Sequence, residues 1–474
     1  MKNEGTKLEV DVLVVGAGPG GIGAALEAHR GGLQVLVVDE NERPGGQIHR
    51  QLSGKPRRAA PRSAPPSAKR LLSAFADSGI KRLWGATAWA SFENGSVEVV
   101  VGRANFRVHF QALVVATGAC DRPYPVPGWT LPGVFTAGGA QALLKSQGLF
   151  PGRRILLAGA GPLQLVVASQ LARSGAGVVA VAEAVSTGDV LRSAHRLLGG
   201  GRLLLDALRY RADVARARIP WISPAAVVEI GGGDRVEFAK VATLDKRWQP
   251  ILGTEETFEV DAVCLGYGLV PSTELVRGLG CEGRFDGTTG GWKPSRDEDC
   301  ETSVRGVFAV GDGAEISGAW VALDEGRLVG RVLASRLKGS DPADRGHRAA
   351  RSIRYRLRRR RRFAAAIREV YRIPDGHFAR PAGGTVICRC EDVPAHRIRT
   401  AILAGAPDLN AVKVRTRLGM GPCQGRMCAA TARAMLSEIS GASSDLIAEL
   451  PSREPVRPIP IAGLLQSAPP PVLS

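Results

Sequence analysis

The chain has 474 residues, of which 44% are hydrophobic and 23% are charged. A chain of this length and composition can bury two or three hydrophobic cores. The opening residues are polar and lack the apolar segment of a secretory signal peptide. The longest uncharged apolar run, residues 155–172, contains glycine, proline and glutamine, so we expect a strand, a turn and a helix there and no membrane span. These features predict a cytoplasmic protein.

The net charge of +18 would ordinarily indicate an anionic partner such as nucleic acid. The 63 basic residues, however, are mostly arginine and much of the excess is scattered along the chain. Such a skew is as easily a compositional bias as a binding surface. We therefore expect no nucleic-acid partner.

The first motif is DVLVVGAGPGG, in which an apolar strand, Val12–Val15, leads into three glycines with G-x-G-x-x-G spacing. The first glycine allows a tight turn, the second lets the backbone approach a pyrophosphate, and the third lets the helix pack against the strand. The N-terminus of that helix faces the phosphates. A second strand, Val35–Val38, ends at Asp39 and Glu40, where an acid can bind a ribose hydroxyl. The stretch predicts a dinucleotide site.

The next 100 residues predict loops and a small sheet. The turn-rich loop at Arg43–Gln47 would run along the cofactor towards its ring end, and residues 53–70 have the composition of a flexible surface loop. Residues 80–112 alternate apolar and polar side chains, which is typical of a small antiparallel sheet. ALVVATG at 112–118 predicts a buried strand, and the proline-rich stretch 123–134 predicts an extended connection between domains.

A second nucleotide-binding pattern follows, with a strand leading into Gly159 and Gly161 and another ending at Glu183. Gln164 replaces the third glycine, which compromises both helix–strand packing and the approach to a pyrophosphate. The fold is therefore expected, whereas the ligand stays open between NAD, another adenine nucleotide such as ATP, and an empty site. If a nucleotide binds, Glu183 without adjacent arginines favours an unphosphorylated ribose.

A third element, TSVRGVFAVGD at 302–312, delivers Gly311 and Asp312 at the end of an apolar strand. An aspartate there can bind the hydroxyl groups of a sugar-alcohol chain, and the helix expected at Ala319–Leu337 can direct its N-terminus at an anionic ring edge. The alternative is that Asp312 only caps that helix.

In order and spacing, the glycine loop, the Ala-Thr-Gly strand end and Gly311-Asp312 resemble the FAD-binding elements of flavoproteins with two dinucleotide-binding domains. The resemblance covers about residues 8–340. It implies that the glycine loop and Asp39 bind the ADP half of FAD, and that Gln47 and the Ala-Thr-Gly strand line its middle. Asp312 would bind the ribityl chain and the pyrophosphate, and the isoalloxazine would lie near the backbone of Ala319. The cofactor-binding residues expected in both units are Gly16, Gly18, Pro19, Gly20, Gly21, Asp39, Glu40, Arg43, Gly46, Gln47, Ala116, Thr117, Gly118, Gly159, Gly161, Glu183, Gly311, Asp312, Ala319 and Trp320.

The chain departs from this resemblance in its cysteines. Relatives that reduce disulfides carry a C-x-x-C or C-x-x-x-x-C pair beside the flavin, and residues 1–380 contain no such pair. Dithiol exchange in the flavin domains is therefore excluded.

Residues 351–363, RSIRYRLRRRRRF, predict an amphipathic helix with a solvated basic face. The alternative is that this face docks another polypeptide or a membrane surface.

Four cysteines cluster near the C-terminus, at Cys388, Cys390, Cys423 and Cys428. Four thiolates from two short loops can hold a 2Fe-2S cluster or one tetrahedral zinc ion, and a redox disulfide is a third option. The C-x-C step is tighter than the usual zinc knuckle, which favours the 2Fe-2S cluster. The stretch also looks like the bacterioferritin-associated-ferredoxin-like 2Fe-2S domain, with helices at 394–405 and 427–440.

The FAD domain, the segment 123–147, the segment LGYGLVPSTEL at 265–275 and the cysteine domain together resemble one group, the FAD-binding subunits of opine oxidases, D-hydroxyproline dehydrogenases and hydrogen cyanide synthase. We accordingly expect an α/β protein with two Rossmann-like dinucleotide-binding domains, the FAD domain being discontinuous, and a small helical iron–sulfur domain with four cysteine ligands at the C-terminus. The expected limits are 8–150 and 286–345 for the FAD domain, 151–285 for the second nucleotide-binding domain, 346–381 for a basic helical linker, 382–441 for the 2Fe-2S domain and 442–474 for a Pro-rich tail.

In that group, amine oxidation takes place on a separate flavoprotein subunit of the glycine-oxidase type, often with a small ferredoxin-like 2Fe-2S third chain. The resemblance thus implies an electron-transfer subunit of a heteromeric amino-acid or opine dehydrogenase, acting on CH-NH or CH-NH2 donors. Its acceptor would be a quinone or another carrier, which leaves room for peripheral association with the inner face of a membrane. The alternatives are a stand-alone NAD(P)H oxidoreductase and a scaffold with structural nucleotides. No acid–base residue is nominated, and His49 is the one histidine that merits mutation.

Overall fold

The computed structural model describes residues 7–53, 65–91, 95–197, 201–339, 345–374, 376–378 and 381–465. Most of the expected loop at 53–70 and the last nine residues of the expected tail lie outside these ranges. The part of 53–70 that is described differs from the expectation, because a helix begins at Pro66 and runs to Ala76.

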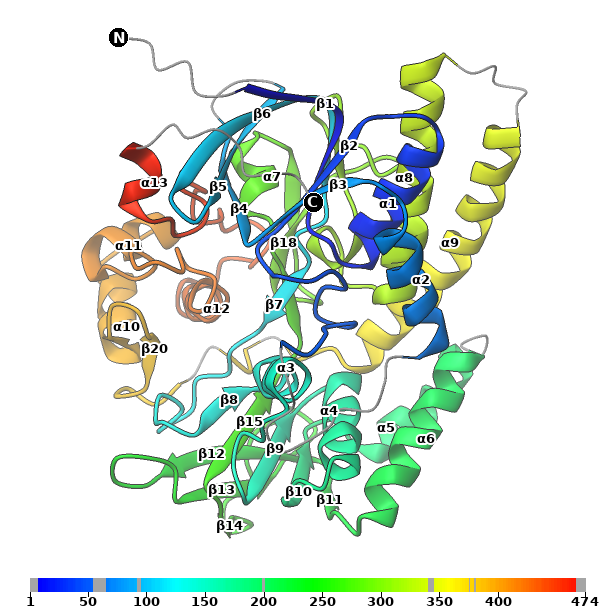
Figure 1. The fold of residues 1–474 in the computed structure, drawn as a ribbon. Coiled ribbons are helices and arrows are strands. Elements are labelled where there is room, and N and C mark those ends of the chain that lie inside the picture. The colour runs from blue at the N-terminus through cyan, green and yellow to red at the C-terminus, as the bar shows by residue number, and fades with distance from the viewer. Residues whose placement is uncertain are drawn as a thin grey trace.

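The first part of the chain forms a seven-stranded sheet in the order β3-β2-β1-β6-β5-β4, with β19 beside β6 (Figure 1). At its centre, Val12, Leu13 and Val14 are fully buried, as expected for a strand covered on both faces. Because β19 returns to this sheet from residue 307, the domain is discontinuous, as predicted. The strands are β1 (Lys7–Val15), β2 (Val35–Asp39), β3 (Lys81–Trp84), β4 (Ala86–Ala90), β5 (Ser96–Val101), β6 (Ala104–Val115) and β19 (Val307–Ala309).

The strand β6 unites two elements that the sequence suggested were separate. Its first half pairs antiparallel with β5, and it pairs in parallel with β1 along most of its length. The small antiparallel sheet and the buried ALVV strand are therefore parts of one sheet. Likewise, β3 does not join the antiparallel strands but pairs in parallel with β2 at the opposite edge.

Two helices, α1 (Pro19–Arg30) and α8 (Ala319–Lys338), pack together closely through glycines. A Cβ on Gly326 would lie 1.9 Å from the carbonyl oxygen of Gly20, and one on Gly23 would lie 2.8 Å from that of Leu323. This close contact brings the N-termini of both helices to the same end of the sheet. The other helices on this domain are α2 (Pro66–Ala76) and α9 (Arg345–Val370), which runs beside α8 (Figure 1).

The second unit contains a five-stranded parallel sheet in the order β11-β10-β9-β15-β8 and a three-stranded antiparallel sheet, β12-β13-β14. Its strands are β8 (Val134–Thr136), β9 (Ile155–Gly159), β10 (Val178–Glu183), β11 (Trp221–Ile222), β12 (Ala225–Gly231), β13 (Phe238–Thr243), β14 (Glu256–Glu259) and β15 (Ala262–Gly266). Its helices are α3 (Ala137–Gln147), α4 (Pro162–Arg173), α5 (Thr187–Arg192), η1 (Ala194–Leu197) and α6 (Arg202–Arg216).

Short elements connect the two units. The ribbon of β7 (Ala119–Asp121) and β16 (Leu269–Pro271) joins their facing ends. It is followed by α7 (Glu274–Gly278), the hairpin of β17 (Gly283–Asp286) and β18 (Gly291–Pro294), and the turn η2 (Gly311–Gly313).

The C-terminal unit has its own core, which includes Ile387, Leu409, Leu418 and Met435. It lies beside the antiparallel half of the first sheet (Figure 1). Its elements are β20 (Val386–Cys388), β21 (Val393–Pro394), α10 (Ala395–Leu403), α11 (Leu409–Thr416) and α12 (Ala429–Ser440). The two predicted helices are thus present, with α11 in addition. In the described ranges, none of the helices is both long and apolar enough to cross a membrane.

Candidate functional site

The first glycine loop has the steric properties that its spacing predicts. Gly16 has a φ of +106°, and a Cβ there would lie 2.3 Å from the carbonyl oxygen of Ala116. A Cβ on Gly21 would lie 1.8 Å from the carbonyl oxygen of Gly16. Both positions therefore exclude any side chain, one at the turn and the other where α1 packs on β1.

Asp39, at the end of β2, is connected directly to this loop. Its carboxylate accepts hydrogen bonds from the amide of Ala17 at 2.6 Å and from the amide of Asn41 at 2.7 Å. The next acid, Glu40, is exposed. On the other side of the loop, a Cβ on Gly46 would lie 2.9 Å from the Cα of Gly18. Of the residues expected around the ADP half of FAD, the glycines and Asp39 are thus brought together, whereas Glu40 is exposed.

The Ala-Thr-Gly strand end lies against the turn that contains Asp312. A Cβ on Gly313 would lie 2.9 Å from both the amide of Gly118 and Oγ1 of Thr117. Asp312 Oδ1 accepts hydrogen bonds from the amides of Ser317 and Gly318, both at 2.8 Å. Burial raises the pKa of Asp312, and these two amide hydrogen bonds oppose that rise.

These contacts test whether the residues fit FAD. Gly16, Gly18, Gly46, Gly118 and Gly313 come from four separate segments and line one cradle of bare backbone. A cradle that side chains would fill, at the N-terminus of α1, suits a pyrophosphate approached by main-chain amides. The donor set therefore fits a dinucleotide such as FAD.

Other predicted residues are less closely engaged. Gln47 is exposed, and Arg43 donates to the carbonyl of Leu52 at 2.7 Å. Ala319 begins α8, whereas the indole of Trp320 lies 5.5 Å from the guanidinium of Arg360 and borders a cavity of about 260 Å³ between α1, α2 and α8. These placements leave the contribution of their side chains to cofactor binding as a prediction.

Lys145 on α3 is a residue that the sequence did not single out. Its ammonium donates to the carbonyls of Gln47 and Ile48, at 3.4 and 3.0 Å, and so ties the cofactor loop to α3. Burial lowers its pKa to about 8, and the charge of Arg50 adds to this. Burial and the charge of Lys145 also lower the pKa of His49. One signal was present, because Lys145 is the only lysine between Lys81 and Lys240 in an arginine-rich chain.

The second glycine loop differs from the first at the position that the sequence indicated. The side chain of Gln164 is fully buried, and its amide donates to the carbonyls of Ala158 at 2.6 Å and Gly266 at 3.2 Å. Gly159 and Gly161 have positive φ angles and form the expected turn. A glycine at this position would allow close contact between helix and strand. Gln164 instead forms hydrogen bonds to the ends of two strands.

Two tyrosines, Tyr267 and Tyr371, lie near the acid of this second unit. Glu183 is 4% exposed, and burial raises its pKa to about 8. Tyr267 and Tyr371 pack in one cluster with Ala160 of the glycine turn and Ala184. Tyr371 belongs to the segment that leaves α9, so this segment covers the strand ends where a nucleotide would bind.

The four C-terminal cysteines lie in two pairs. Cys388 and Cys428 are within hydrogen-bonding reach of each other, and so are Cys390 and Cys423. The Cys428 thiol lowers the pKa of Cys388 to about 6, and the amides of Gly419, Glu391 and Cys390 act in the same direction. In turn, the pKa of Cys428 is raised well above its ordinary value. The structure thus brings the four cysteines together in pairs, and their role as ligands stays a prediction.

The glycines around the cysteines fit a bound cluster. A Cβ on Gly421 would lie 2.3 Å from the Cβ of Cys390, and Gly419 and Gly425 both have positive φ angles. Among the described residues, no three His, Cys, Asp or Glu side chains converge on one point as ligands of a single ion. A 2Fe-2S cluster has two irons and four thiolate ligands, and the two cysteine pairs match that requirement.

Side chains from both other units hold the cysteine unit in place. The indole of Trp129, in the interdomain connection, donates to the carbonyl of Val386 at 2.6 Å. Arg426 forms an ion pair with Glu274 and donates to the carbonyl of Val456. The tail then crosses the first sheet, where the amide of Val456 donates to the carbonyl of Trp89, and its described part runs to α13 (Ile461–Leu465). The described part of the tail is therefore a strap between two units.

The arginine helix differs from the solvated face that we expected. Arg354, Arg356, Arg360, Arg361 and Arg368 all form ion pairs with acids of the first domain. That expectation is wrong for this side of α9, because the acids of α8 and of the preceding loops neutralise it. Arg351, Arg358, Arg359 and Arg362 remain exposed.

Comparison with known proteins agrees with this geometry. Residues 10–326 match the family described as pyridine nucleotide-disulphide oxidoreductase, and residues 386–438 match the BFD-like [2Fe-2S] binding domain. The chain is 35% identical to the opine oxidase A subunit of Agrobacterium tumefaciens, over 96% of this chain and 91% of that protein. It is 32% identical to hydrogen cyanide synthase subunit HcnB of Pseudomonas aeruginosa, over 95% and 97% of the two chains.

A solved structure shares the fold across the whole chain. The L-proline dehydrogenase of P. horikoshii superposes with a TM-score of 0.71 at 22% identity, and the match covers 98% of this chain and 81% of that one. Together with the glycine cradle and the paired cysteines, these matches establish an FAD- and 2Fe-2S-binding oxidoreductase fold. The chain belongs to the pyridine nucleotide-disulphide oxidoreductase family, in the branch that carries a C-terminal BFD-like [2Fe-2S] domain and includes the opine oxidase A subunit and HcnB.

Proposed function

We propose that this chain is the electron-transfer subunit of a heteromeric dehydrogenase for secondary amines of the amino-acid or opine type. The observation that carries the proposal is the fixed docking of the cysteine unit on the flavin domain, through Arg426–Glu274 and the tail strap. A cluster held in one place relative to a flavin suits repeated electron transfer between the two. When bound, FAD would accept electron pairs and the 2Fe-2S cluster would pass single electrons.

The residues of this chain would bind and orient these groups. Gly16, Gly18 and Gly46 present backbone to the pyrophosphate, and Asp39 orders the glycine loop. Asp312, held by two amides, lies where a ribityl chain would pass. Lys145 fixes the loop that leads from the cradle towards α3. These roles are binding and orientation, and they need no general acid or base.

Oxidation of the amine is assigned to a partner subunit. Loss of two electrons and two protons from a CH-NH donor gives an imine, which water can hydrolyse. The opine oxidase relative and HcnB are both named as subunits, which supports a multi-subunit assembly here. We propose a glycine-oxidase-like flavoprotein as the partner that binds the amine, with a small ferredoxin-like 2Fe-2S chain as a third component and a quinone or similar carrier as the acceptor.

Co-purification from the native host tests this assignment. We expect a second flavoprotein chain to accompany this one, and we expect an amine or opine to bleach the flavin absorbance of the complex under anaerobic conditions. The isolated chain should show no bleaching with the same amine. Full amine-oxidising activity in the isolated chain would contradict the partner assignment.

A second candidate is an NAD(P)H oxidoreductase, favoured by the intact Rossmann-like fold of the second unit. Gln164 in the glycine loop and the packing of Tyr267 and Tyr371 against Ala160 of that loop oppose it. Anaerobic titration of the isolated chain with NADH and NADPH separates the two candidates. We expect the flavin to stay oxidised, and prompt bleaching would favour the second candidate. A third possibility, a scaffold with structural nucleotides, predicts that no amine reduces the flavin of this chain even in the assembled complex.

A further inference from the structure

Helix α9 is attached to α8 by carboxylates that are almost completely buried. Asp324 is 1% exposed and accepts hydrogen bonds from Arg356 at 3.0 Å and from Arg360 at 2.7 Å. Glu325 is equally buried and accepts from Arg361 at 2.7 Å. A buried carboxylate without its partner is costly, so these arginines fix the position of α9 on the first domain.

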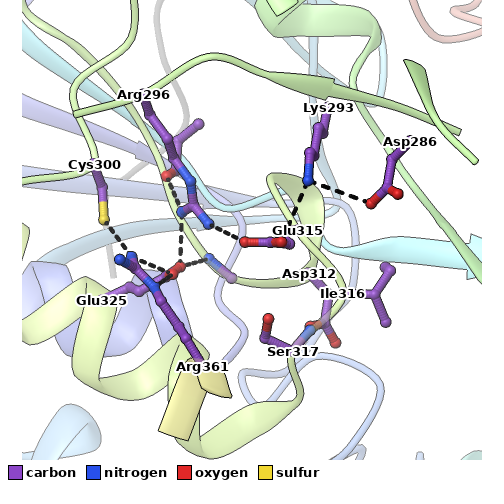
Figure 2. Close-up of polar contacts among 12 residues, drawn as sticks. Asp286, Lys293, Arg296, Cys300, Asp312, Glu315, Ile316, Ser317, Glu325 and Arg361 are labelled. Carbon is purple, nitrogen blue, oxygen red and sulfur yellow. Dashed lines mark hydrogen bonds and ion pairs between the residues drawn. The ribbon is translucent and has the colours of Figure 1, made fainter. Parts of the chain in front are cut away.

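One of these carboxylates also reaches the turn that precedes Asp312. Oε2 of Glu325 accepts a hydrogen bond from the amide of Gly311 at 2.7 Å and from Arg296 at 3.0 Å. Figure 2 shows Glu325 between Arg296 and Arg361, with Asp312 and Ser317 on the neighbouring loop. Arg361 therefore supports the first residue of this turn through Glu325.

Arg368, two helical turns further along α9, holds the rest of the same loop. Its guanidinium donates to Oε1 of Glu315 at 3.0 Å, to Oγ of Ser317 at 3.1 Å and to the carbonyl of Ile316. The amides of Ser317 and Gly318 are the ones that bind Asp312. One guanidinium thus connects three consecutive residues of the loop that sets the Asp312 carboxylate.

We propose that Arg368 is a positioning residue for the flavin, acting through the loop 315–318 on Asp312 and on the N-terminus of α8. The inference rests on the proposed FAD site at Asp312. A planar guanidinium can hold a carboxylate, a carbonyl and a hydroxyl in one fixed arrangement, which an ammonium cannot do. The same helix leads on to the segment before the cysteine unit, so α9 links the flavin loop to that unit by covalent continuity.

The test uses the full chain with the substitutions Arg368→Gln and Arg368→Lys, and with Arg359→Gln as an exposed, charge-matched control on the same helix. The measurements are the Kd of the apoprotein for FAD, by flavin fluorescence, and the midpoint potential of the bound flavin. For Arg368→Gln we expect FAD binding weakened on the order of tenfold, since charge-assisted hydrogen bonds to the loop are lost. The potential should become more negative, because the substitution removes a positive charge from the loop that holds Asp312, and such a charge would favour a reduced flavin bound at the proposed site.

Arg368→Lys keeps the positive charge beside Glu315 but not the contacts to all three loop residues. Compared with Arg368→Gln, it should therefore bring the flavin potential closer to the wild-type value than the affinity for FAD. It also serves as the informative variant if Arg368→Gln does not fold. Wild-type affinity and potential in both Arg368 variants would overturn the inference, as would a lowered melting temperature with both flavin properties unchanged. In either case wild-type FAD binding would leave the proposed function standing, whereas a wild-type chain that binds no FAD would remove both.

Discussion

Arg426, which lies between Cys423 and Cys428, forms an ion pair with Glu274 at the start of α7. The neighbours of Glu274, Leu275 and Val276, belong to the core of the first domain. The pair therefore joins the loop that carries two cysteines directly to the domain that carries the glycine cradle. Both side chains are largely buried, so the pair is less screened than a surface ion pair.

Arg426→Gln should loosen this junction without removing either cofactor. We expect unchanged iron and FAD contents, faster proteolytic release of the cysteine unit, and slower electron transfer between flavin and cluster in stopped-flow experiments. Arg397→Gln, on the exposed side of α10, is the control and should behave as wild type. Unchanged proteolysis and electron transfer in Arg426→Gln would show that the pair does not hold the units together.

The cysteine pairs predict a selective loss of the cluster. Cys388→Ser and Cys423→Ser, one from each pair, should each abolish the brown iron–sulfur absorbance and leave the yellow flavin in place. Cys120→Ser, at a half-buried cysteine outside the cluster, should retain both chromophores. If the brown colour survives in Cys388→Ser or Cys423→Ser, that residue is not a ligand.

The contact between Gly313 and the Ala-Thr-Gly strand end predicts a steric effect on FAD. Gly313→Ala would place a Cβ 2.9 Å from Gly118 and Thr117, which forces the cradle apart. We expect the purified variant to have lost most of its FAD and to have a lower melting temperature. Gly287→Ala, where the added Cβ meets nothing within 4 Å, is the matched control. Full FAD content in Gly313→Ala would argue that the cofactor does not depend on this contact.

Lys145 predicts a pH dependence of stability. Its pKa falls from an ordinary value of 10.5 to about 8 in the folded chain, so between these values the unfolded chain binds more protons than the folded chain. Stability should therefore rise with pH in this window. Lys145→Met removes the titrating group, and the melting temperature of the wild type relative to this variant should increase from pH 8 to pH 10. A constant difference would indicate that the ammonium is not buried in solution.

The cofactor loops and the arginine helix differ in how much of their structure could be predicted from the sequence. Three features could be predicted from the sequence: the G-x-G-x-x-G loop, Asp39 and the cysteine spacing. Each of them depends on backbone geometry or on a fixed set of ligand atoms. Steric exclusion at Gly21 is local, because a Cβ there would meet the carbonyl oxygen of Gly16, whereas a Cβ on Gly16 would meet Ala116, 100 residues further along the chain. The replacement of a glycine by Gln164 was likewise visible in the sequence. The hydrogen bonds from its amide to the ends of two strands could not be predicted from it.

The arginine helix shows what only the tertiary structure decided. In sequence, its basic residues cannot be distinguished from a solvated or membrane-facing surface, because charge repeats at helical spacing do not identify the opposing face. The acids that neutralise them, such as Asp299, Asp324 and Glu325, lie 32 to 55 residues earlier in the chain, and only the folding of α8 and its preceding loop beside α9 brings them to it. Local geometry therefore predicted the cofactor loops, whereas long-range pairing of buried charges determined what holds them in place.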